Sequence, residues 1–126
     1  MQDITQDVIE LIRLTSTDLP QEIETSLKVA MEDEEKGSAA QAAMESIVKN
    51  IEMSRKNVTP ICQDTGTPLF FVKYGQGWDP AQLRIQIRAA IAQATKLSYL
   101  RPNAVDSLHG NNTGNNLGDD HFPTIH

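Results

Sequence analysis

The only cysteine of the chain lies in the run Pro60-Ile61-Cys62-Gln63-Asp64-Thr65-Gly66-Thr67. A thiol, a carboxamide and a carboxylate follow one another directly, and a turn-forming Thr-Gly pair comes next. A thiolate is a soft metal ligand, and an acid beside it can take part in proton transfer. Because one cysteine cannot complete a metal site, a metal bound at Cys62 would need further ligands from outside this chain.

Two interpretations of Cys62 stay open from the residues alone. Free cysteine is among the most buried residue types, which favours a structural role in the core. Gln63 and Asp64 are poor core residues, however, and Gly66 lets the backbone approach a ligand closely. These neighbours favour a site carried on a connecting loop.

Asp64 and Arg101 are the charged residues whose surroundings suggest chemistry. Asp64 could act as a general acid or base beside a metal or an arginine, or it could close an Asx-turn with its own backbone. Arg101 lies in the run Leu100-Arg101-Pro102-Asn103-Ala104-Val105. Its guanidinium suits bidentate binding of a carboxylate, and pairing with a helix end is the alternative.

The remaining polar groups give weaker signals. The histidines are His109, His121 and His126. Their spacing matches no common zinc pattern, and all are distant in sequence from Cys62, so a thiol–imidazole pair has no support. The run from Gly110 to Asn116 has turn chemistry and amides that could bond ligand or backbone, but it has no lysine to make a phosphate cradle.

Composition limits the class of protein. The chain has 126 residues, a hydrophobic content of 39% and a net charge of -6. This length and composition predict one globular domain. The acidic balance argues against nucleic acid or an anionic membrane as the main partner. With one cysteine, no signal-peptide pattern and no apolar run of about 20 residues, we expect a cytoplasmic location and no membrane span.

Four amphipathic helices are predicted from apolar spacing and capping residues. Their expected starts include Pro20 for the second, Ser38 with Gln41 for the third, and Asp79-Pro80 for the fourth. The expected buried stripes are Ile4, Val8, Leu11 and Ile12; Ile23, Leu27, Ala30 and Met31; Ala40, Met44, Ile47, Val48 and Ile51; and Leu83, Ile87, Ala90, Ile91 and Ala94.

Outside the helices, the run 69–74 has strand character, and residues 122–126 resemble the start of another strand. The fold class is therefore α+β and mainly α: about four helices, a short strand or small sheet and a long irregular C-terminal segment. We divide it into a helical region 1–57, the cysteine motif and strand 58–77, a helix 79–98 and a loop segment 99–126. A loop this long favours a fragment of a larger fold.

The motifs resemble those of class I, iron–sulfur-dependent fumarate hydratases, and in particular their alpha subunit. The resemblance lies in the blocks 60–67, 70–72, 100–106 and 112–114, which occur in the family's order. L(+)-tartrate dehydratase alpha subunits share the Cys-Gln-Asp-Thr-Gly run. The resemblance implies that the chain is the N-terminal part of the alpha region of a hydro-lyase that hydrates fumarate to L-malate. It implies a [4Fe–4S] cluster with one iron open to substrate.

Carried over by position, Cys62 resembles the first cluster ligand and Gln63 a substrate-binding amide. Asp64 resembles an active-site acid that contacts substrate and moves a proton, and Arg101 an arginine that grips a carboxylate of the small dicarboxylate. The other two cysteines would come from the rest of the alpha region, and further groups from a beta subunit or domain in an oligomer. With one ligand of three, we expect the isolated chain to be inactive.

One departure and two alternatives accompany this resemblance. Relatives commonly have a Pro-Leu-Thr-like stretch where this chain has Ser107-Leu108-His109. The resemblance therefore does not predict the path of this loop. Tartrate dehydratase is the nearest alternative enzyme. The alternatives from other classes are a non-catalytic helical interaction domain, in which Cys62 would be buried, and a thiol-dependent redox or hydrolytic enzyme.

Overall fold

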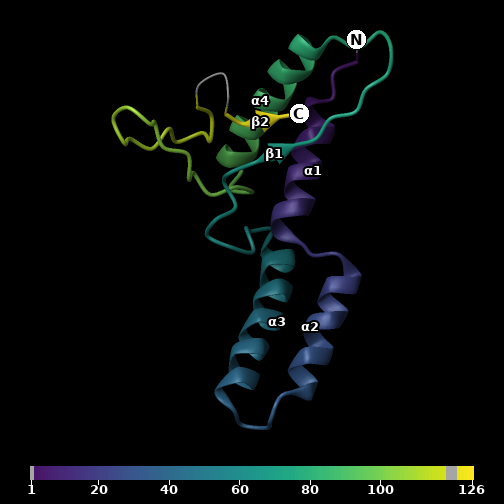
Figure 1. Cartoon of the computed structure of the whole chain (residues 1–126), viewed down its shortest axis with the longest axis vertical. Coiled ribbons are helices and arrows are strands. Elements are labelled where there is room, and N and C mark those ends of the chain that lie inside the picture. Colours follow the sequence, from purple (N-terminus) through teal and green to yellow (C-terminus); the bar gives the residue numbers. More distant parts are fainter. Residues whose placement is uncertain (1, 119–121) are drawn as a thin grey trace.

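A computed structural model describes residues 2–118 and 122–126. Its elements are, in chain order, α1 (Thr5–Thr17), α2 (Gln21–Asp33), α3 (Ala39–Asn57), β1 (Leu69–Phe70), α4 (Pro80–Lys96) and β2 (Thr124–Ile125). Figure 1 shows α1, α4 and the two strands grouped in one body, from which the α2–α3 hairpin extends. The predicted mainly α, α+β architecture is confirmed.

The predicted starts of α3 and α4 are confirmed by their caps. The Ser38 hydroxyl accepts a hydrogen bond from the Gln41 backbone N–H, and the Gln41 side chain accepts one from the Gly37 N–H. At α4, the Asp79 carboxylate accepts from the Ala81 N–H, and Pro80 occupies the first helical position. These bonds satisfy donors that a helix start leaves without intrahelical partners.

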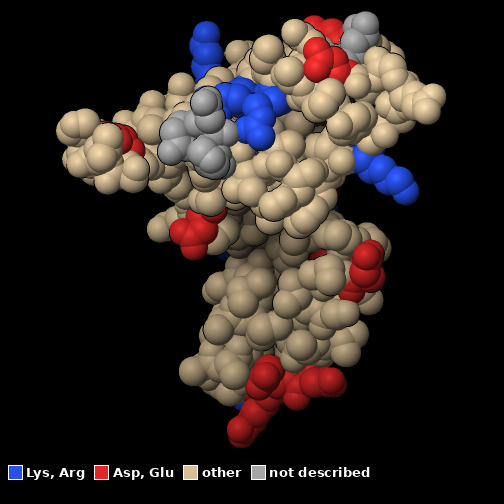
Figure 2. All heavy atoms as spheres, turned by 45° about the horizontal axis from the view of Figure 1, so that its top comes forward, with Lys and Arg blue, Asp and Glu red and all other residues tan. Residues whose placement is uncertain are grey.

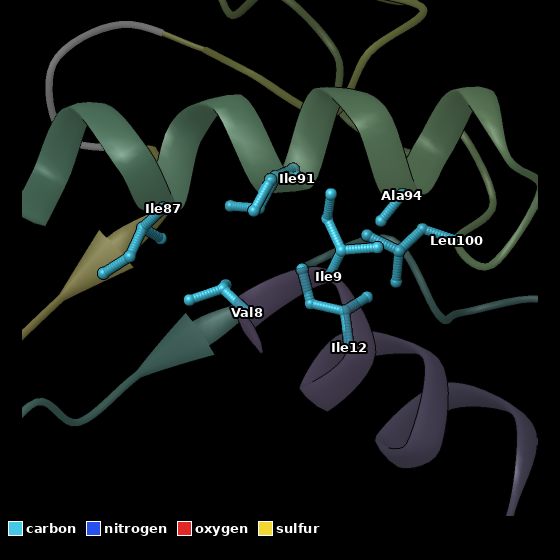
Figure 3. Close-up of a cluster of buried hydrophobic side chains, with 8 residues drawn as sticks. Val8, Ile9, Ile12, Ile87, Ile91, Ala94 and Leu100 are labelled. Atoms are coloured by element: carbon cyan, nitrogen blue, oxygen red, sulfur yellow. The ribbon is translucent and has the colours of Figure 1, made fainter. Parts of the chain in front are cut away.

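The core of the body forms between α1 and α4. The whole predicted stripe of α4 is buried, and Ile87 and Ile91 are only 2% and 0% exposed. Figure 3 shows these side chains pointing toward Val8, Ile9 and Ile12 of α1, with Leu100 beside them. Burial of these large aliphatic groups, each contributing about 1.5–3 kcal/mol, is what joins the two helices.

The predicted stripe of α1 is partly wrong. Leu11 is 55% exposed, whereas Ile9, which the prediction omitted, is buried. Helix α1 has five closely spaced apolar residues at positions 8, 9, 11, 12 and 14, so two overlapping stripes fit its sequence. Packing on α4 selects the stripe that contains Val8, Ile9 and Ile12.

The predicted buried stripes of α2 and α3 also include residues that the structure leaves exposed. Ile23, Ala30, Ala40 and Ile47 are exposed. In the hairpin, α2 packs mainly on α3, so there is one seam to fill and outlying apolar residues stay outside it. The only buried residue of α2 is Glu24, which binds Lys28 and Arg55 through 2.8 and 2.5 Å ion pairs.

The two strands form a small parallel sheet. Leu69 lies opposite Thr124 and Phe70 opposite Ile125. The predicted strand in 122–126 is therefore confirmed, while the predicted strand 69–74 is shorter than expected because its partner pairs over only two residues. Residues 99–118 are irregular, as predicted, with one isolated bridge between Val105 and Asn112. His121 lies outside the described residues.

No helix in the described ranges is long and apolar enough to cross a membrane.

Candidate functional site

The residue before Cys62 is fixed by two helices. Helix α3 ends at Asn57, and the next residue, Val58, caps it in a left-handed backbone with φ 53°. The chain then returns to the body, where the Ile61 N–H donates to the Ser16 carbonyl of α1 at 2.9 Å. The Ile61 carbonyl accepts from the Asn50 side chain of α3, also at 2.9 Å. Cys62 thus begins its turn from an anchored position.

The Cys62 turn is closed by its own backbone and by Thr65. The Thr65 hydroxyl donates to the Cys62 carbonyl at 3.0 Å, and the Gly66 N–H donates to the Asp64 carbonyl at 2.9 Å. The Asp64 carboxylate takes no part in these two bonds, which argues against the Asx-turn interpretation. The side chains of Cys62, Gln63 and Asp64 are exposed. In the described chain Cys62 is thus outside the core, which argues against the buried structural interpretation.

The turn lies directly against the segment that carries Arg101. The Arg101 N–H donates to the Thr65 carbonyl at 2.8 Å, and the Asn103 side chain donates to the Gln63 carbonyl at 2.6 Å. The second bond joins residues 40 positions apart in the sequence. The structure therefore brings together the backbones of all four predicted site residues.

Gly66 explains why the two segments can approach so closely. A Cβ atom at this position would lie 2.1 Å from the Arg101 carbonyl oxygen and 2.9 Å from the Asn103 Cβ. Only glycine fits at such a crossing without moving backbone. The sequence suggested that Gly66 admits a ligand; instead it admits the neighbouring chain segment.

A buried asparagine that sequence reasoning did not single out supports the Arg101 segment. Asn116 is 0% exposed. Its side-chain oxygen accepts from the N–H groups of Asn103 and Ala104 at 2.8 and 3.1 Å. Its side-chain nitrogen donates to the Arg101 carbonyl at 2.7 Å and to the Thr95 hydroxyl of α4 at 3.0 Å. The only sequence signal was its place in an Asn- and Gly-rich run.

Asn116 also has the backbone that such a run permits. Its φ is 57°, in the left-handed region that asparagine tolerates better than most residues. The side chain uses its whole bonding capacity, two bonds accepted and two donated. A carboxamide at this position therefore holds the end of α4 and the Arg101 segment in one arrangement.

His109 belongs to a separate local cluster. Its Nδ1 lies 2.7 Å from the Asp106 carboxylate, which also accepts from the backbone N–H groups of Leu108 and His109. These bonds, that from Leu108 foremost, hold the pKa of Asp106 below its ordinary value. The Ser107-Leu108-His109 departure thus lies in a loop closed by Asp106.

Two clefts border the junction between the turn and the Arg101 segment. One, of about 380 Å³, is lined mainly by apolar residues of α1 and of 67–71, with Asp64 in its lining. The other, of about 620 Å³, is lined by residues 103–108, by Thr67 and by parts of the C-terminal segment. The lining of the first contains no lysine or arginine, so it does not complement a dianion. Of the predicted substrate-binding residues, only Asp64 lines either cleft.

Part of the acidic charge lies far from this junction. Figure 2 shows acidic side chains gathered at the free end of the α2–α3 hairpin, where the run Glu32-Asp33-Glu34-Glu35 lies. The net charge of -6 is thus partly placed far from Arg101. An anion at the Arg101 segment would be repelled less than the overall charge suggests.

The donor set in the described ranges fits one ligand of an iron–sulfur cluster. An exposed, free thiol on an anchored turn is a suitable iron ligand once deprotonated. No group of three or more histidine, cysteine or acidic side chains that could hold a metal ion occurs in the part of the chain that the structure describes. A cluster at Cys62 would therefore depend on ligands from elsewhere.

Comparison with known proteins gives consistent matches over nearly the whole chain. The family model described as fumarate hydratase (Fumerase) matches residues 5–126. A protein of Geobacillus stearothermophilus with the provisional name fumarate hydratase class I is 44% identical over 119 residues, covering 94% of this chain and 23% of the relative.

Two further relatives are named as subunits. An L(+)-tartrate dehydratase subunit alpha of Escherichia coli is 31% identical, covering 91% of this chain and 38% of the relative. A Methanocaldococcus jannaschii protein provisionally named as the same subunit is 29% identical and is covered over 41% of its length. The chain thus spans less than half the length of these relatives.

Proposed function

The chain belongs to the fumarate hydratase (Fumerase) family, and on that premise we propose that it is the N-terminal part of a hydro-lyase alpha region. The reaction proposed is the reversible hydration of fumarate to L-malate. The observation that carries the proposal is the pair of bonds that places the Cys62-Gln63-Asp64 turn against the Arg101 segment, Arg101 N–H to Thr65 and Asn103 to Gln63. These residues are far apart in sequence, and the family match alone does not require that they meet.

The roles of the three polar side chains follow from the charge of the substrate. Malate and fumarate are dianions, and Arg101 supplies a guanidinium that binds a carboxylate through two parallel hydrogen bonds. Gln63 supplies an uncharged amide that orients the substrate. Asp64, adjacent to Gln63 on the same turn, acts as the proton-transfer group.

In the dehydration direction, Asp64 takes a proton from the carbon next to the one that bears the hydroxyl. The electron pair left behind forms the double bond as the hydroxyl leaves with its bonding electrons. The departing hydroxide takes up one proton to become water, and Asp64 loses its proton before the next turnover. Negative charge develops transiently on the neighbouring carboxylate, and Arg101 stabilises it. In the hydration direction Asp64 returns the proton to the same carbon.

Cys62 is the residue of this chain that would hold the cofactor, a [4Fe–4S] cluster. When bound, such a cluster with one open iron supplies a Lewis acid for the substrate hydroxyl. Cys62 is exposed, as a ligand shared with other chain segments must be. The remaining ligands would come from the rest of the alpha region, and further substrate contacts from a beta subunit or domain, in a cytoplasmic oligomer.

A second candidate is L(+)-tartrate dehydratase, because the named Escherichia coli subunit is 31% identical to this chain. Both reactions remove water from a small hydroxydicarboxylate, and the four site residues would serve either. The third candidate is a non-catalytic helical interaction domain in which Cys62 would be buried. The exposure of Cys62 argues against it. Assaying the complete protein with fumarate, malate and tartrate decides between the two enzymes.

Substitution of Asp64 tests the proposed mechanism. In the complete protein, Asp64→Asn keeps the size of the side chain and removes the base, so we expect kcat to fall by about 10²–10⁴-fold. The matched control is Asp33→Asn, an exposed aspartate at the end of α2. Turnover by Asp64→Asn within twofold of the wild type would contradict the assignment.

A further inference from the structure

Two asparagines connect the predicted substrate-binding groups to the core of the fold. Asn103 is exposed and donates its side-chain N–H to the Gln63 carbonyl at 2.6 Å. Its own backbone N–H donates to the buried side chain of Asn116 at 2.8 Å. Asn116 in turn bonds Thr95 on α4. A continuous path of amide hydrogen bonds therefore runs from helix α4 to the turn that carries Gln63 and Asp64.

Arg101 is held by the same path. Its carbonyl accepts from the Asn116 side chain at 2.7 Å and from the Asn103 backbone N–H at 2.9 Å. Its N–H is bonded to Thr65 at 2.8 Å. Both backbone groups of Arg101 are thus fixed, one by the Cys62 turn and one by the two asparagines.

We propose that Asn103 and Asn116 are positioning residues that set the place of Arg101 relative to Gln63 and Asp64. The inference rests on the proposed function, because it assigns these asparagines a purpose only if the three side chains bind one dicarboxylate. Neither asparagine needs to touch the substrate. Each acts through the backbone of the segment that it holds, where a displacement of about 1 Å can cost about 10²-fold in rate.

The chemistry of the amide suits this purpose better than a charged or apolar side chain. Asn116 must accept from two N–H groups and donate to two oxygen atoms at once, and a carboxamide has that combination. A carboxylate would face the Arg101 carbonyl with a lone pair. A leucine would remove all four bonds, and the buried Ala104 N–H, which among the described residues bonds only to the Asn116 side chain, would lose its partner.

The test is a double-mutant cycle in the complete protein, with succinate as a competitive dicarboxylate probe. Asn103→Ala removes the bond to Gln63 at an exposed position, so the fold is retained. We expect the inhibition constant for succinate to rise by about tenfold in the wild-type background and by less than about twofold in an Arg101→Ala background. A residue that only stabilised the fold would have equal effects in both.

Asn116→Asp provides the second variant, and Asn111→Ala the matched control. We expect Asn116→Asp to show the same dependence on Arg101. Asn111 is exposed in the same irregular segment, and its backbone carbonyl, rather than its side chain, bonds Asp106. Its substitution should change the succinate constant by less than about twofold. If Asn116→Asp fails to fold, the succinate constants of Asn103→Ala in the two backgrounds still test the positioning role.

The outcomes separate two failures. Equal effects of Asn103→Ala in the two backgrounds, or no effect in either, overturn the positioning role while the proposed function stands. If Arg101→Ala itself leaves succinate binding unchanged, the assignment of Arg101 in the proposed function is wrong, and the positioning role falls with it.

Discussion

Substitution of Gly66 by alanine should separate the two halves of the candidate site. The added Cβ would lie 2.1 Å from the Arg101 carbonyl oxygen, well below the 3.0 Å that such contacts essentially never undercut. The obstacle is backbone, so it cannot rotate away as a side chain could. The turn and the Arg101 segment must therefore move apart by about 1 Å or more.

The size of the effect follows from what that movement breaks. Overpacking of a tight site costs about 1–3 kcal/mol. The bonds from Arg101 to Thr65 and from Asn103 to Gln63 would stretch or break, at about 1 kcal/mol each. We expect Gly66→Ala to lose about 3–5 kcal/mol of stability. We also expect a loss of about 10²-fold in kcat/KM through misplacement of Arg101.

The assay compares Gly66→Ala with Gly75→Ala in the complete protein, by thermal unfolding and steady-state kinetics. A Cβ at Gly75 would meet no atom within 4 Å, so this control should behave as the wild type. If Gly66→Ala keeps kcat/KM within twofold of the wild type, the close crossing does not position the site and the reasoning is refuted.

Three further predictions concern the hairpin, the core and the fragment. Hydrogen bonds from Arg55, and after it Lys28, lower the pKa of Glu24 from 4.5 to about 2, so the stabilisation by this carboxylate should be present above pH 4.5 and lost as the pH falls toward 2. Acid unfolding followed by circular dichroism should therefore depend less on pH in Glu24→Gln than in the wild type. An unchanged acid transition would contradict the pairing. Ile91→Ala should lower the free energy of unfolding, measured by chemical denaturation, by about 2–5 kcal/mol. Ile85→Ala, at a 57% exposed position of α4, should lower it by less than about 0.5 kcal/mol. Equal losses would refute the packing described. The isolated 126-residue chain should show no hydratase activity after anaerobic iron–sulfur reconstitution, and turnover above background would count against shared ligation of the cluster.

Helix starts and the α4 stripe could be predicted because they depend on local chemistry. Ser38 and Asp79 cap helices through bonds to residues within three positions, and such bonds are visible in sequence. Burial on α1 could not be resolved in the same way. The choice between Ile9 and Leu11 depends on where α4 lies, and that is a tertiary fact.

For the candidate site, too, local features could be predicted and tertiary contacts could not. The types of Cys62, Gln63, Asp64 and Arg101 pointed to their chemistry, and the family resemblance on which their roles depend is confirmed. Their adjacency could not be predicted from spacing, because it arises from bonds across 40 residues. The importance of Asn116 was hidden because nothing local distinguishes it from the other asparagines of its run; only burial does.

The central claim is that the Cys62 sulfur is an iron ligand, and anaerobic spectroscopy of the complete protein tests it most directly. Wild type and Cys62→Ser would be compared by visible absorption, electron paramagnetic resonance and iron content, with far-ultraviolet circular dichroism to verify the fold. We predict that Cys62→Ser folds as the wild type does but lacks the [4Fe–4S] signals and the activity. A Cys62→Ser protein with the full iron content and wild-type turnover would contradict the claim.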